Sequence, residues 1–101
     1  MSKSVIEVLK EAREKIRQGW CQGGPARDHR DATISTGDPN ACKWCLFGAL
    51  MAVTDDWDGP RAAIKEFTGC SLAEWNDAPG RTKAEVLALL DKAIERAEAE
   101  A

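Results

Sequence analysis

The longest run of apolar positions lies between residues 39 and 53, where Lys43 is the only charged side chain. In a helical projection its apolar residues point to every side instead of forming one stripe. A helix that is apolar all round is a helix buried all round, so this run predicts a central helix over residues 39–53. Asp38 is expected to cap this helix, and Pro39 to fill its first position, where no backbone N–H is needed.

Amphipathic helical periods precede and follow the central run. Each begins at a capping box, in which a hydroxyl and a carboxylate three residues apart bond the free backbone amides of a first turn. The boxes are Ser4–Glu7, Ser71–Glu74 and Thr82–Glu85. A further helix is expected from near Pro60, capped by Asp58 or Gly59 and ended by Gly69, while Gly19 is a natural left-handed terminator of the first helix.

Residues 20–37 show no helical period and predict a long irregular loop. Gly23, Gly24 and Pro25 break any regular structure, and residues 32–35 favour a short extended piece. Long loops in small domains are either functional or mobile, and the sequence does not separate these alternatives. The predicted fold is therefore all-α: one domain over residues 1–101, with four to five helices around the helix 39–53 and the loop 20–37.

Composition and charge exclude several classes of protein. The chain of 101 residues is 44% hydrophobic and 31% charged, which is typical of a soluble globular domain. Its net charge of −3 argues against a nucleic-acid binder, which would normally carry a basic face. We find no signal peptide and no apolar run long enough to span a membrane, so we expect a cytoplasmic protein without membrane contact.

The four cysteines suggest a metal site as one alternative. Cys42 and Cys45 form a C-x-x-C pair, which offers two of the four ligands that zinc requires. Cys21 or His29 would have to complete the set, because the sequence has no second C-x-x-C. Buried cysteines are also common apolar fillers, so we expect no cofactor and keep a zinc-binding protein as an alternative.

A thiol-dependent enzyme is the other alternative. Cys42 would lie in the first turn of the predicted central helix, where the helix dipole lowers a thiol pKa, and His29 is the only histidine. A redox C-x-x-C normally follows a strand, and no strand is evident before this pair. A cysteine and a histidine alone specify little, so we do not expect an enzyme.

A cluster of tryptophan, arginine and polar residues suggests a recognition surface. Tryptophan and arginine are enriched in binding hot spots, and the chain has four tryptophans but no tyrosine. The candidate binding residues are Trp20, Gln22, Arg27, Asp28, Trp75, Asn76, Asp77 and Arg81. Against a binding role, several of them also suit turns, and Trp75 suits the core.

Four sequence blocks resemble a known family. They are Gly19-Trp20-x-Gln22-Gly23, Arg27-Asp28, Trp44-Cys45-Leu46-x-Gly48-Ala49-Leu50 and Trp75-Asn76-Asp77-x-x-Gly80-Arg81-Thr82. In this order they resemble a family of small uncharacterised bacterial and phage proteins, classed as a domain of unknown function. The resemblance implies a shared helical fold and an accessory role in a phage or mobile element, but it implies no activity.

These observations favour a small non-enzymatic binding or accessory module. We expect it to engage a protein or small-molecule ligand through the loop 20–28 and the turn 75–82. The sequence identifies neither the partner nor the oligomeric state.

Overall fold

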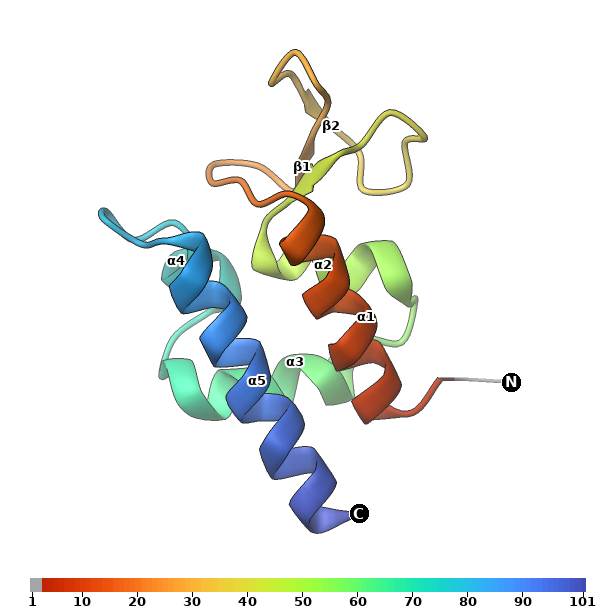
Figure 1. Cartoon of the computed structure of the whole chain (residues 1–101), viewed down its shortest axis with the longest axis vertical. Coiled ribbons are helices and arrows are strands. Elements are labelled where there is room, and N and C mark those ends of the chain that lie inside the picture. The colour runs from red at the N-terminus through yellow and green to blue at the C-terminus, as the bar shows by residue number, and fades with distance from the viewer. Residues whose placement is uncertain (1–2) are drawn as a thin grey trace.

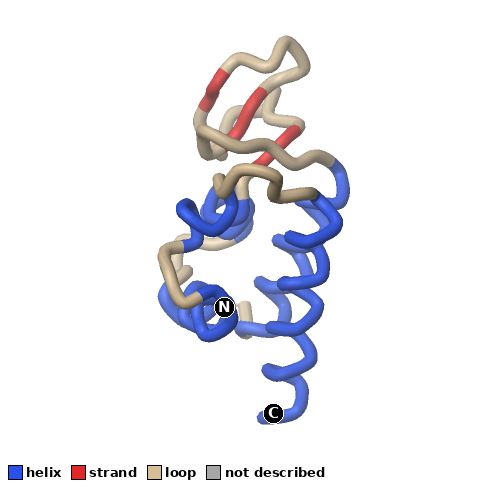
Figure 2. The backbone as a smooth tube through the Cα atoms, turned by 90° about the vertical axis from the view of Figure 1, so that its left-hand side faces the viewer, coloured by secondary structure: helices blue, strands red, loops and turns tan. Residues whose placement is uncertain are grey.

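The structure, a computed structural model, describes residues 3–101, which form five helices and three short strands. The helices are α1 (Val5–Gln18), α2 (Leu46–Val53), α3 (Asp58–Thr68), α4 (Leu72–Asn76) and α5 (Lys83–Glu100). The strands are β1 (Ala26–Arg27), β2 (Thr33–Ile34) and β3 (Lys43–Trp44). Helices α1 and α5 lie antiparallel against each other, and the strands gather at the end of the molecule opposite the C-terminus (Figure 1; Figure 2).

The predicted helix starts are confirmed where a capping box marks them. The Ser4 hydroxyl accepts from the Glu7 amide at 3.1 Å, while the Glu7 carboxylate accepts from the Ser4 amide. Thr82 and Glu85 make the same reciprocal pair at the start of α5. Helices α1 and α5 thus begin where their own side chains satisfy the first-turn amides.

The core is formed mainly by the apolar faces of α1, α2 and α5. In α1 the apolar residues Leu9, Ala12 and Ile16 are fully buried on one face of the helix, whereas Val5 near its start is 37% exposed. From α5 come Val86, Leu90 and Ala93, which are fully buried. Among residues 3–101, no helix combines the length and apolar character that a membrane crossing requires.

A small antiparallel sheet replaces part of the predicted irregular loop, so the chain is mostly but not strictly helical. The strand order is β2-β1-β3, with Ala26 opposite both Ile34 and Trp44. The extended piece predicted near residues 32–35 is β2. Strands this short give little sequence signal, because only two residues of each pair with a neighbour.

The prediction of a helix over residues 39–53 is wrong in its first half. Asp38 and Pro39 lie in a turn, where the Asp38 carboxylate accepts from the Asn40 amide at 2.8 Å. Trp44 belongs to β3, and its amide donates to the Gly19 carbonyl at 3.0 Å. Helix α2 begins only after Cys45, the extended N-cap residue, whose sulfur accepts from the Gly48 amide. A short apolar run fits a buried strand as well as a buried helix, which explains the error.

Two further predicted boundaries change for local reasons. Gly19 is not left-handed: its φ of −175° is extended, and glycine is needed because a Cβ would lie 2.1 Å from the Cys42 carbonyl oxygen. Helix α3 begins at Asp58, and its N-cap residue, Trp57, makes no side-chain capping bond. Gly69, in contrast, ends α3 as predicted, and it does so in the left-handed conformation, with φ of 71°.

Candidate functional site

Asn76 is the most highly connected of the candidate residues. It is the last residue of α4, and its side chain is completely buried. Its Oδ1 accepts from Trp20 Nε1 at 2.7 Å and from the Leu46 amide at 3.0 Å. Its Nδ2 donates to the Cys21 carbonyl at 3.1 Å and to Asp77 Oδ1 at 2.9 Å. Because all four hydrogen-bonding positions of the amide are filled, Asn76 fixes the relative positions of three segments.

The loop 20–28 and the turn 75–82 meet around Asn76, as expected for one surface. Gln22 Nε2 donates to the Asn76 carbonyl at 2.9 Å and to the Ala78 carbonyl at 3.2 Å. Asp77 Oδ1 accepts from the Gly23 amide at 3.1 Å. We call the set Trp20, Gln22, Asn76 and Asp77 the Asn76 junction. The indole N–H of Trp20, the side-chain amide nitrogen of Gln22, the whole amide of Asn76 and Oδ1 of Asp77 make hydrogen bonds within the protein.

Arg81 and Trp75 form a second internal pair next to this junction. The Arg81 guanidinium carbon lies 3.7 Å from the centre of the Trp75 ring, and Arg81 Nε donates to the Trp75 carbonyl at 2.8 Å. The nearest carboxylate partner is that of Glu85, 3.4 Å from Arg81. This arrangement holds the turn before α5 against α4.

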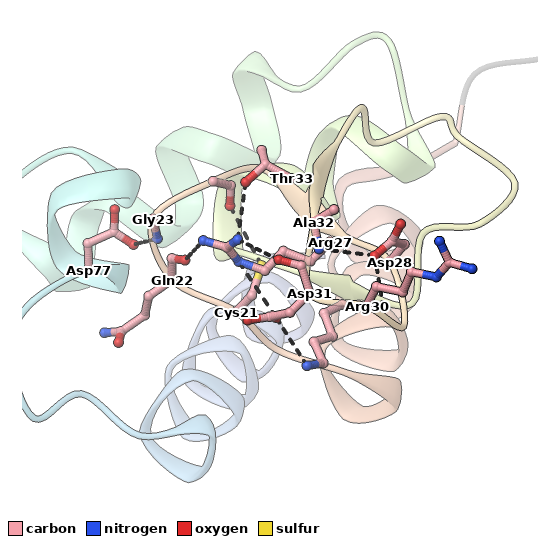
Figure 3. A network of polar contacts seen from close by, with 12 residues as sticks. Cys21, Gln22, Gly23, Arg27, Asp28, Arg30, Asp31, Ala32, Thr33 and Asp77 are labelled. Atoms are coloured by element: carbon pink, nitrogen blue, oxygen red, sulfur yellow. Dashed lines mark hydrogen bonds and ion pairs between the residues drawn. The ribbon is translucent and has the colours of Figure 1, made fainter.

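Arg27 and Asp28 organise the β1–β2 hairpin (Figure 3). The Arg27 guanidinium donates to the carbonyls of Gln22 and Asp31, each at 3.0 Å, and to Thr33 Oγ1 at 3.1 Å. Asp28 Oδ1 accepts from the Ala32 amide at 3.0 Å, and this bond lowers the pKa of the Asp28 carboxyl. Both side chains therefore use these polar groups to stabilise the hairpin, and the same groups are not free for a ligand.

Two of the four cysteines have thiols that are harder to ionise than a free thiol, and Cys42 lies outside the helix that was expected to activate it. Cys42 lies outside α2, so the prediction that it occupies a first helical turn is wrong. Cys45 does cap that helix, but burial raises the pKa of its thiol. Burial also raises the pKa of the Cys21 thiol, to about 11. His29 lies exposed in the turn between β1 and β2. A thiol with a raised pKa is a poor nucleophile at neutral pH.

The metal alternative also gains no support. Within residues 3–101, no group of three or more His, Cys, Asp and Glu side chains is arranged to hold a metal ion. Cys42 and Cys45 lie on either side of β3. They do not share a helical face, because α2 begins only after Cys45, which is its N-cap residue. The C-x-x-C spacing therefore belongs here to a strand-to-helix connection.

The raised pKa of Cys21 predicts an alkaline loss of stability. An unfolded thiol ionises near pH 9, whereas the folded thiol keeps its proton to about pH 11. Between these values the unfolded chain binds fewer protons, so stability falls as pH rises. We expect the wild-type Tm to fall more steeply between pH 9 and 11 than that of Cys21→Ala, measured by circular dichroism. Parallel Tm curves for the two proteins would contradict this.

Two surface compartments lie beside the Asn76 junction, and both are lined by Phe47 and Ala73. One compartment, of about 220 Å³, is lined by Phe47, Arg61, Lys65, Ser71, Leu72 and Ala73. The other, of about 260 Å³, is lined by Gly23, Gly24, Pro25, Cys45, Phe47, Ala73 and Asp77. We call the whole the Phe47 groove. It contains residues of both predicted binding segments, namely 23–25 and Asp77. A larger groove of about 410 Å³ lies between α1, α3 and α5 and contains none of the predicted binding residues.

Sequence reasoning missed Phe47, Arg61 and Lys65 as candidate site residues. Arg61 and Lys65 are four positions apart on α3 and so share one helical face, a spacing visible in the sequence. Their position beside α4 depends on the packing of α3 and α4, which the sequence pattern does not give. Phe47 reads as core in the sequence, but it is only half-buried.

Comparison with known proteins gives a family but no activity. Residues 1–96 match the model of a family described as "Family of unknown function (DUF6197)". This match confirms the expected relation to a domain of unknown function. No curated protein and no solved structure matches the chain.

Proposed function

We propose that this chain, which belongs to the DUF6197 family of unknown function, is a non-enzymatic binding module whose ligand lies in the Phe47 groove. The observation that carries the proposal is that the two candidate binding segments meet at this groove. The module would act as an accessory protein, in a bacterium or phage as the resemblance of the sequence blocks suggests, and would engage a protein or a small ligand.

In this proposal the candidate residues position the groove instead of making every contact to the ligand. Asn76 and Gln22 tie the loop 20–28 to α4, and Asp77 holds the Gly23 amide at the groove edge. A binding surface built on fully bonded side chains is preorganised, because little conformational entropy is lost when a ligand arrives. The buried Asn76 network is the kind of support that such a surface needs.

The composition of the groove also supports binding. Phe47 packs edge-on against Trp57, with ring centres 5.0 Å apart. The guanidinium carbon of Arg61 lies over the Trp57 ring, 5.0 Å from its centre. Aromatic and arginine side chains with restricted motion are enriched among the residues that dominate binding energy. Half-buried Phe47 stands between the two compartments, where it would contact a ligand in either one.

The experiment that tests this proposal is a fragment screen followed by ¹H–¹⁵N NMR of the labelled protein. The probes are a diverse set of small aromatic and acidic fragments. We expect shift changes on the backbone amides of residues 23, 24, 45–47 and 72–77. Shifts confined to the groove between α1, α3 and α5, or no fragment binding anywhere, would contradict the proposal.

A further inference from the structure

We propose that the natural ligand of the Phe47 groove is an extended peptide segment of a partner protein with an acidic residue beside an apolar one. The carboxylate would contact Arg61 and Lys65, and the apolar side chain would pack on Phe47 and Leu72. This inference rests on the proposed function, since it names the partner class for the same groove.

Among residues 3–101, the two cations at one end of the groove, Arg61 and Lys65, have no strong ionic partner. Lys65 makes no ion pair with any residue among 3–101, and the closest carboxylate to Arg61 is that of Asp58, at 3.7 Å. Asp58 is 82% exposed, and so loose a surface pair contributes little. Both cations therefore remain free to bind a carboxylate from another molecule. Arg61 is additionally held over the Trp57 ring, which limits its motion.

The compartment beside these cations is apolar at its base. Leu72 is buried, Phe47 is half-buried, and Ala73 leaves open space above them because its side chain is a single methyl group. An apolar side chain placed here would cover the exposed part of Phe47. The combination of an apolar wall and two cations fits an acidic residue next to an apolar one.

The far end of the groove has the opposite charge. Asp77 is exposed, and the two hydrogen bonds it accepts from described residues, from the Gly23 amide and Asn76 Nδ2, both end on Oδ1. Its Oδ2 is therefore available to a backbone N–H or a basic side chain of the ligand. A ligand with a carboxylate at one end and a donor at the other would bind in one direction only.

The dimensions favour a peptide over a compact small molecule. Each compartment alone, of about 220 and 260 Å³, is below the roughly 300–1,000 Å³ typical of a small-molecule pocket, and only a ligand that occupies both would reach that range. Two adjoining small compartments resemble the successive side-chain pockets that receive alternate residues of an extended peptide. The glycines at positions 23 and 24 leave room for a peptide backbone to approach closely.

A random twelve-residue peptide display library, selected on the wild-type protein, tests this inference. We expect the recovered peptides to share an Asp or Glu next to an apolar residue. A synthetic copy should lose about tenfold in affinity for Lys65→Glu, measured by fluorescence anisotropy, because an attraction becomes a repulsion. Lys92→Glu is the matched control: it makes the same charge change on α5, outside this groove, and should change the affinity little.

The outcomes separate this inference from the proposed function. Recovered peptides without an acidic residue, or equal affinities for wild type and Lys65→Glu, would overturn the acidic-peptide inference. If fragments still shift the backbone amides of residues 23, 24 and 72–77, the proposed function stands despite that result. If neither fragments nor peptides bind the groove, both are contradicted.

Discussion

Gly48→Ala should destabilise the protein by about 3 kcal/mol or more, or prevent it from folding. The added Cβ would lie 1.9 Å from the Pro25 carbonyl oxygen, which is far inside van der Waals contact. A carbonyl oxygen cannot rotate away as a flexible side chain would. That same oxygen accepts from the Cys45 amide, so the loop 23–27 would have to move away from the start of α2.

Urea denaturation followed by circular dichroism measures this loss. Gly37→Ala is the matched control, because a Cβ at position 37 meets nothing within 4 Å. We expect the control to stay within about 0.5 kcal/mol of wild type, as surface substitutions usually do. If Gly48→Ala were as stable as Gly37→Ala, the close packing of the loop 20–28 on α2 would be wrong.

Asn76→Ala should reduce the free energy of unfolding by about 3–5 kcal/mol. The change removes four hydrogen bonds and leaves Trp20 Nε1, the Leu46 amide and the Cys21 carbonyl without this partner. Each polar group left unsatisfied in the interior costs about 1–3 kcal/mol. Asn76→Asp should be no better, because it would place a carboxylate beside the Cys21 carbonyl and the Asp77 carboxylate, both of which now accept bonds from Nδ2.

The same denaturation experiment applies, with Asn40→Ala as the control. Asn40 is exposed, and only its backbone amide is used, in a bond to Asp38. A loss for Asn76→Ala no larger than that for Asn40→Ala would show that Asn76 does not hold the segments together.

The helical part of the fold was largely predictable from the sequence. Ser4–Glu7 and Thr82–Glu85 mark helix starts through bonds between residues three apart, so the local sequence is sufficient to place them. The burial of Leu9 and Leu90 follows from the helical period in the same way. These features depend on neighbouring residues only.

The strand-to-helix connection at Trp44 and Cys45 was not predictable in the same way. Trp44 is in β3 because it pairs with Ala26 and bonds to Gly19, residues 18 or more positions away in the chain. The apolar pattern around Trp44 is equally compatible with a helix. Long-range backbone pairing therefore decided the local structure.

The candidate site was predictable as a set of segments but not as a geometry. The sequence indicates that the segments around Trp20 and Trp75 matter, and the structure brings them together at Asn76. The sequence alone gives no sign that Asn76 is buried, nor that Arg61 on α3 lies next to the same groove. The burial of Asn76 depends on how α4 packs against the loop 20–28 and the start of α2, and the place of Arg61 depends on how α3 and α4 pack.

Blocking the Phe47 groove with a large side chain tests directly whether the ligand binds there. Ala73 lines both compartments and is exposed, so Ala73→Trp should fill the groove without disturbing the core. Ala84→Trp makes the same change at an exposed position of α5, away from the groove. We would measure the Kd of the tightest fragment or peptide by calorimetry. We expect Ala73→Trp to weaken binding at least about tenfold and Ala84→Trp to leave it unchanged. Equal affinities for the two variants would show that the ligand binds elsewhere.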